Sequence, residues 1–174
     1  ELVQRLRQLI PYSETGFPDS LLPPGVTNTD LFDTNTFLNT PGGELTGYEI
    51  TAQTPFTFLP GPFDKFGGQL SYTSIESEVS YVLAATIGAG FVQAPLTGQS
   101  PESISATLYY EDGPFQARIS AVSRAEYLTL VPAASGNDFE GKADVLNVDF
   151  SASYEVSDNF TLSFEAINLT DQFD

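Results

Sequence analysis

The chain has 174 residues, of which 41% are hydrophobic and 13% aromatic, a composition that favours a folded protein over a disordered one. Cysteine and histidine are absent, which excludes Cys and His nucleophiles, His bases and the usual zinc sites, and we expect no catalytic residues, no metal ion and no cofactor. The formal net charge of −17 repels nucleic acid phosphates, so DNA and RNA are excluded as partners.

Residues 1–43 contain no extended alternating pattern. The apolar residues between Leu2 and Ile10 have the spacing of one short amphipathic helix, although the same stretch could equally form a strand. Residues 11–43 are rich in Pro, Thr, Asn, Asp and Gly, which predicts a long loop. Loops longer than about 12 to 15 residues are uncommon in compact soluble domains and indicate either a function or disorder. We therefore interpret residues 1–43 as an N-terminal segment followed by a long, extracellular loop.

Residues 44–174 have a different pattern, in which apolar and polar residues alternate with a period of two. This pattern predicts six antiparallel strands at about residues 43–54, 66–74, 105–112, 115–128, 145–156 and 160–169. Short links alternate with long ones, which places all tight turns at one end of the array and all long loops at the other. Residues 122 and 123 interrupt the alternation, either through a β-bulge or because the end of a strand tolerates the exception.

The medium on the apolar side of these strands is either lipid or a protein core. Strands of about 9 to 12 residues are long for a soluble protein and close to the length that crosses a bilayer. Aromatic residues gather near both strand ends, as in the girdles of outer-membrane barrels. A soluble secreted β-sandwich that serves as a binding or adhesion module remains the alternative, because alternation is common to both architectures. A glycoside hydrolase that uses two facing acids is disfavoured, since no supporting cleft residues are evident.

Several motifs follow one another in a fixed order: the strand opening Gly47-Tyr48-Glu49, the hairpin "YEDGPFQAR", the turn "SDNFTL" and the closing "NLTD". In this order they resemble the C-terminal part of the barrel of TonB-dependent outer-membrane receptors, over most of residues 11–174. The resemblance implies a bacterial outer-membrane barrel of about 22 strands that imports a scarce nutrient, such as a ferric siderophore, a vitamin or an oligosaccharide, and that is not an enzyme. It also implies partners: the nutrient, the remainder of the barrel, a plug domain, the TonB complex that acts through the plug, and outer-membrane lipid. Six strands are too few to close a barrel, so we expect the chain to be a fragment that lacks the plug.

In this interpretation the two faces of the strands have different surroundings. Lipid contacts one set of residues: Tyr48, Ile50, Leu70, Leu108, Ile119, Phe150, Leu162 and Phe164. The lumen contacts the other set, from which we select as candidate substrate-binding residues Glu49, Gln53, Arg118, Arg124, Asp149 and Glu165. Guanidinium groups hold carboxylates and phosphates with two parallel hydrogen bonds, so the two arginines either contact the substrate or the plug, or neutralise nearby carboxylates. The long loops at residues 11–43, 76–102 and 127–144 are the expected ligand surface.

Overall fold

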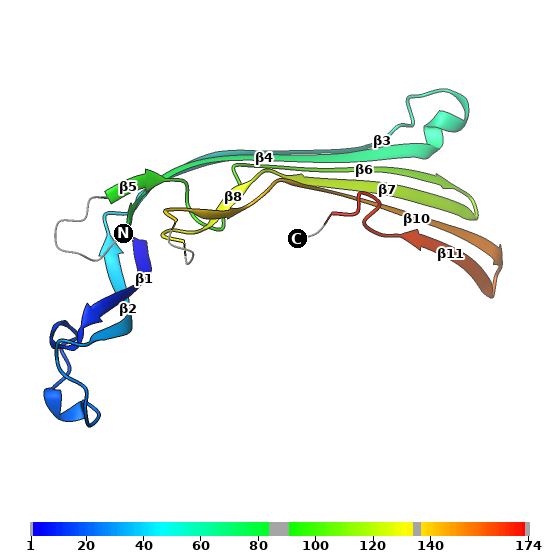
Figure 1. Ribbon diagram of the computed structural model, residues 1–174. Coiled ribbons are helices and arrows are strands. Elements are labelled where there is room, and N and C mark those ends of the chain that lie inside the picture. Colours follow the sequence, from blue (N-terminus) through cyan, green and yellow to red (C-terminus); the bar gives the residue numbers. More distant parts are fainter. Residues whose placement is uncertain (1, 84–90, 134–136, 173–174) are drawn as a thin grey trace.

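The computed structural model describes residues 2–83, 91–133 and 137–172, and its main feature is one antiparallel sheet in the strand order β11–β10–β7–β6–β4–β3 (Figure 1). A further strand, β5, pairs with the outer part of β4. The strands of this sheet are β3 (Gly43–Pro55), β4 (Phe66–Val82), β5 (Phe91–Ala94), β6 (Glu102–Asp112), β7 (Phe115–Arg124), β10 (Val145–Ser157) and β11 (Phe160–Ala166). The prediction of an all-β, antiparallel fold is confirmed, and the sheet is not closed on itself.

The connections between the strands differ at the two ends of the sheet (Figure 1). At the end that we call the turn end, β6 and β7 are joined through Gly113, whose φ of 55° is one that glycine adopts without strain. The link between β10 and β11 is equally short, and the link between β3 and β4 contains the 3₁₀ helix η3 (Gly61–Lys65). The opposite end, the loop end, carries the longer connections, as the sequence predicts.

The register separates apolar from polar side chains across the six strands β3, β4, β6, β7, β10 and β11. Residues that lie opposite each other in an antiparallel pair share one face of the sheet. On the apolar face one such row contains Gly68, Leu108, Ile119, Phe150 and Ala166. On the polar face the next row contains Gly67, Tyr109, Arg118, Ser151 and Glu165.

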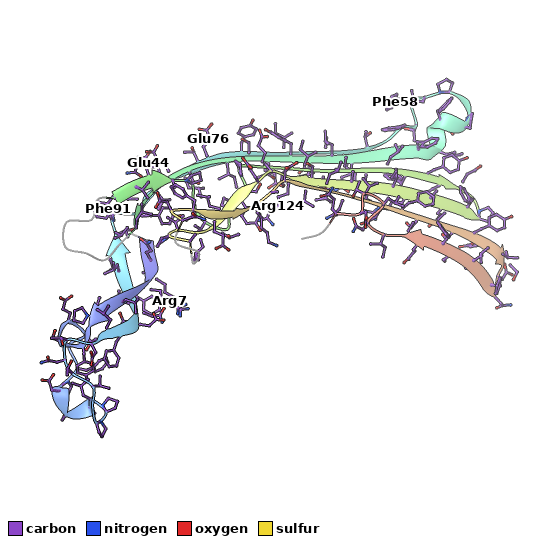
Figure 2. All side chains as sticks on the ribbon, viewed as in Figure 1. Arg7, Glu44, Phe58, Glu76, Phe91 and Arg124 are labelled. Carbon is purple, nitrogen blue, oxygen red and sulfur yellow. The ribbon has the colours of Figure 1, made fainter. Side chains whose placement is uncertain are left out.

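The two faces also differ in curvature. Figure 2 shows Glu44 and Glu76 on the convex side of the arc and Arg124 on the opposite side. Glu44 and Glu76 belong by register to the apolar face, near its loop end, whereas Arg124 lies opposite Ser103 on the polar face. The concave side of the sheet is therefore its polar side.

The main sheet has a single layer. The accessible surface of the chain is 12042 Å², whereas a compact monomer of 18.8 kDa exposes about 8,300 Å². Much of the excess is apolar, since Ile50, Leu162 and Phe164 are each about 60% exposed on the apolar face. A β-sandwich buries this face against a second sheet, and the described residues provide no such sheet.

A small hydrophobic core lies at the loop end. It consists of Val79 and Tyr81 of β4, Ala94 of β5 and Val131, each less than 8% exposed. The Tyr81 hydroxyl accepts a hydrogen bond from the backbone N–H of Thr97 at 2.9 Å. Because Val79, Ser80 and Tyr81 are consecutive and all buried, the alternation of faces ends here.

The segment before the main sheet forms a hairpin of its own. Of the two structures that the sequence allowed for its first residues, helix or strand, the strand is the one observed, as β1 (Leu2–Pro11). The loop expected after it is wrong in part, because it contains strand β2 (Leu31–Thr40), which pairs with β1. Two 3₁₀ helices, η1 (Tyr12–Glu14) and η2 (Asp19–Leu21), lie between them. Several half-buried positions of β2 are threonines, which have a high β propensity but are not strongly hydrophobic. Hydrophobic and polar residues therefore do not alternate clearly in this strand.

The other two predicted loops also contain strands. The region 76–102 includes the end of β4 and all of β5, and the region 127–144 contains the short hairpin of β8 (Tyr127–Leu130) and β9 (Glu140–Lys142). The predicted strand 115–128 ends at Arg124. Its register is continuous through Val122 and Ser123, so the interruption of the pattern is not a bulge.

Candidate functional site

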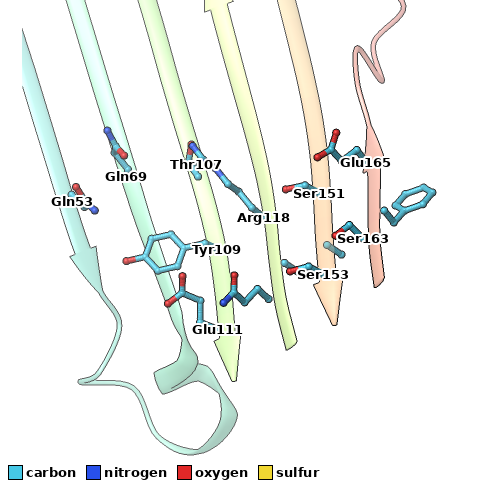
Figure 3. Close-up of a pocket in the computed structure, with 14 residues that line it drawn as sticks. Gln53, Gln69, Thr107, Tyr109, Glu111, Arg118, Ser151, Ser153, Ser163 and Glu165 are labelled. Atoms are coloured by element: carbon cyan, nitrogen blue, oxygen red, sulfur yellow. The ribbon is translucent and has the colours of Figure 1, made fainter. Parts of the chain in front are cut away.

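A hollow of about 600 Å³ lies on the polar face, toward the turn end of the sheet (Figure 3). Its lining comes from strands β3, β4, β6, β7, β10 and β11, and most of the side chains are amides, hydroxyls or charged groups. Three of the six predicted site residues, Gln53, Arg118 and Glu165, line it together. The other polar side chains around it are Gln69, Thr107, Tyr109, Glu111, Gln116, Ser151, Ser153 and Ser163.

Arg118 is the one cationic residue among those that line this hollow. Its Nε donates a hydrogen bond to Oγ of Ser120 at 3.2 Å, which orients the side chain along β7. Within the described parts of the chain the ion pairs are Arg7–Asp33 and Lys65–Asp64, so no carboxylate lies within 4.0 Å of the Arg118 guanidinium. The remaining guanidinium N–H groups are therefore available to a ligand or to another protein surface.

Tyr109 is a feature of the hollow that the sequence reasoning missed. Its ring lies over Gly67 of the neighbouring strand, where an added Cβ would come within 2.2 Å of the Tyr109 Cζ. On the other face of β4, a Cβ on Gly68 would meet the Phe56 ring at 3.1 Å. Gly67 and Gly68 thus let one aromatic ring lie on each side of β4. This Gly-Gly pair was the feature of the sequence from which the close approach of the rings could have been predicted.

The other predicted site residues lie on the polar face but outside the lining of this hollow. Glu49 accepts a long hydrogen bond of 3.4 Å from the Ser71 hydroxyl. The Arg124 guanidinium stacks on the ring of Tyr127, with its Cζ 3.9 Å from the ring centroid. Neither residue shares the hollow with Arg118, so the predicted set forms no single site.

Asp149 has a structural partner in the closing "NLTD" motif. Its Oδ1 accepts the backbone N–H of Asn168 at 2.8 Å, and Asn168 has a φ of 55°, in the left-handed region. The N–H of Leu169 then bonds to the carbonyl of Val148 at 2.8 Å. The motif therefore folds back onto β10 beyond the end of β11, and the Asp149 carboxylate stabilises that turn.

The chemistry of the hollow is that of binding. Hydroxyls, amides and one guanidinium can donate and accept hydrogen bonds around a polar ligand or a polar protein surface.

Among the described residues no group of three or more acidic side chains has the geometry to hold a metal ion. The same residues include no helix that is long and apolar enough to cross a membrane.

Comparison with known proteins identifies the family. The family model described as "TonB dependent receptor-like, beta-barrel" matches residues 16–169. No curated protein and no solved structure matches the chain. The resemblance noted in the sequence is therefore confirmed over most of its length, and the matched region includes all seven strands of the main sheet. The chain belongs to the β-barrel family of TonB-dependent receptors, which are nutrient receptors of the outer membrane.

Proposed function

We propose that residues 44–174 form one sector of the wall of an outer-membrane barrel that imports a scarce nutrient, with residues 1–43 as an extracellular segment above it. The nutrient classes we consider are ferric siderophores, vitamins and oligosaccharides. The observation that carries the proposal is the separation of the two faces in register across six strands. In this arrangement lipid covers the apolar face and a wet lumen covers the polar face.

Aromatic pairs near both ends of the apolar face support this orientation. Phe66 and Tyr110 have ring centroids 4.8 Å apart near the turn end, and Tyr48 and Tyr72 have centroids 5.9 Å apart toward the loop end. Aromatic girdles of this kind lie at the two interfaces of a bilayer. Short turns of such barrels face the periplasm, so the loop end with its hydrophobic core lies outside the cell.

On this proposal the hollow around Arg118 contacts the plug domain or the passing nutrient. Gln53, Arg118 and Glu165 serve this contact directly, because they line the hollow. Glu49 and Arg124 lie farther toward the loop end of the same face and contribute nearer the outer opening. Import itself also requires the plug and the TonB complex, which are not part of this sheet.

Single cysteine probes test the two faces, because the chain has no cysteine of its own. Leu108 and Thr107 are adjacent on β6 and lie on opposite faces. In the full receptor reconstituted in vesicles, a fluorophore at Leu108→Cys should be quenched by lipid-borne quenchers, and one at Thr107→Cys should be quenched only by aqueous ones. Ile119→Cys and Ser120→Cys on β7 repeat the comparison.

Quenching of neither Leu108→Cys nor Ile119→Cys by lipid would contradict the barrel. That result would favour the soluble β-sandwich, in which both side chains pack against a second sheet.

A further inference from the structure

A second groove, of about 620 Å³, lies between the β1–β2 hairpin and the segment 130–133. In Figure 2 Arg7 points into the angle between this hairpin and the main sheet. The groove is far from the hollow around Arg118 and shares no lining residue with it. Its lining residues are Arg5, Arg7, Leu9, Asp33, Asn35, Leu130, Pro132 and Ala133.

The two walls of this groove are held together by Gln4. This side chain is only 5% exposed, and its Nε2 donates to the carbonyl of Val82 at 2.8 Å and to the carbonyl of Val131 at 3.0 Å. Its Oε1 accepts the N–H of Val82 at 2.8 Å. A buried amide with three such bonds fixes β1 against both the end of β4 and the segment that forms the other wall. The groove is thus built into the fold.

The two arginines of the groove differ in their partners. Arg7 is neutralised, because its Nε donates to both carboxylate oxygens of Asp33, at 3.0 and 2.9 Å, and its Nη2 forms an ion pair with the same group. The hydrogen bond from Arg7 lowers the pKa of the Asp33 carboxyl, so the pair is charged at neutral pH. Arg5 has a neutral partner instead: its Nε donates to Oδ1 of Asn35 at 3.3 Å.

Arg5 therefore carries an uncompensated charge. In the part of the chain that the structure describes, no carboxylate lies within 4.0 Å of its guanidinium. A guanidinium fixed through Nε still has two terminal amino groups that can bind a carboxylate with two parallel hydrogen bonds. The Arg5 guanidinium is therefore a local site for one negative charge. The net charge of −17 of the whole chain repels anions that carry several charges.

Apolar surface adjoins that charge. Leu9 is 66% exposed and Leu130 is 41% exposed, although both line the groove together with the ring of Pro132. A ligand that covers them gains about 25 cal/mol for each Å² of apolar surface removed from water. The groove therefore offers one anion-binding fork beside an apolar wall.

We propose that this groove binds a ligand with a single carboxylate and an apolar or aromatic body, the carboxylate on Arg5 and the body against Leu9, Leu130 and Pro132. This goes beyond the import of an unspecified nutrient, and it does not require transport, because binding is measured on the receptor alone.

Equilibrium dialysis of the purified full receptor in lipid nanodiscs tests the proposal with 2-naphthoate as the probe and 2-naphthylmethanol as its uncharged counterpart. The wild-type receptor should bind 2-naphthoate, and Arg5→Gln should weaken this binding about tenfold or more. Asp33→Asn should strengthen it severalfold, because it frees the Arg7 guanidinium. Lys142→Gln is the matched control, since it removes the same charge from β9 at the same end of the sheet and should change nothing.

Three results would overturn the proposal: no binding of 2-naphthoate to the wild-type receptor, equal binding by Arg5→Gln, or equal binding of 2-naphthylmethanol. The gain expected for Asp33→Asn separates a lost contact from a damaged fold, because a misfolded variant does not gain affinity. A receptor that binds 2-naphthoate as described but imports no nutrient would contradict the proposed function and leave this inference standing.

Discussion

An arginine at Ala106 should destabilise the barrel strongly, whereas an arginine at Thr107 should not. Ala106 lies on the apolar face between Leu70 and Ala121. It is four residues from Tyr110 toward the turn end and four residues from Glu102 toward the loop end. At about 3.3 Å per residue and a tilt of about 40°, each distance corresponds to a height of roughly 10 Å. In an apolar band about 25 Å tall, this places Ala106 near the midplane.

A charged arginine at that depth costs about 2–4 kcal/mol. A cost of about 3 kcal/mol lowers the ratio of folded to unfolded receptor by a factor of roughly 150. Thr107 lies on the polar face, which borders the water-filled lumen in the proposed barrel, so Thr107→Arg should change the ratio little. Urea titration of the full receptor in phospholipid vesicles, with the folded fraction read from the mobility of unheated samples on gels, measures both variants.

The depth dependence provides the decisive comparison. The cost should fall from Ala106→Arg to Ile104→Arg, because Ile104 lies nearer the outer interface on the same face. Equal costs for Ala106→Arg and Thr107→Arg, or no decrease toward Ile104, would refute the assignment of lipid to the apolar face.

Three further outcomes follow from particular contacts. Gly67→Ala should cost about 1–3 kcal/mol, since its Cβ would overlap the Tyr109 ring, and a double-mutant cycle with Tyr109→Ala should show that the two changes are not additive. Gln4→Leu should speed hydrogen exchange in β1 and β2 but not in β6, because the loss of three buried hydrogen bonds costs about 1–3 kcal/mol locally. The pKa of Asp33 is lowered by its hydrogen bond from Arg7, so the protection of the hairpin should be complete above the usual carboxyl pKa of about 4 and be lost as the pH falls through the lowered value. Asp33→Asn should abolish this pH dependence of the protection. If the protection of the wild-type hairpin, relative to an unfolded peptide at the same pH, did not change over this range, the role of the pair would be contradicted.

The main sheet could be predicted from sequence because each of its strands carries its own signal. Alternation of period two specifies a strand and its faces, and Gly113 specifies the tight turn between β6 and β7. The register follows, since a shift of one residue would expose an apolar side chain such as Leu108 to the wet side. Correct faces therefore required no knowledge of long-range contacts.

The hairpin of residues 2–40 could not be predicted in the same way. The Thr and Asn residues of β2 have the composition of a loop, and β1 is anchored by Gln4, whose partners Val82 and Val131 are distant in sequence. The candidate site was only partly predictable for a similar reason. The alternation of residues along the strands placed Gln53, Arg118 and Glu165 on one face. The alternation does not reveal that the Asp149 carboxylate accepts a hydrogen bond from the backbone of Asn168.

Strand β4 passes through two environments, and each imposes a different rule on substitution. In the proposed barrel, a residue between Gln69 and Ser74 contacts lipid or lumen according to whether its position is even or odd, so hydrophobic character is constrained while size is free. From Val79 to Tyr81 three successive side chains are enclosed by protein, so size is constrained on both faces. Random mutagenesis of this strand should therefore yield functional variants in which the tolerated residues alternate between hydrophobic and polar in the first part and have conserved volumes in the second. The position at which this alternation stops would report, from genetics alone, where the strand leaves the bilayer.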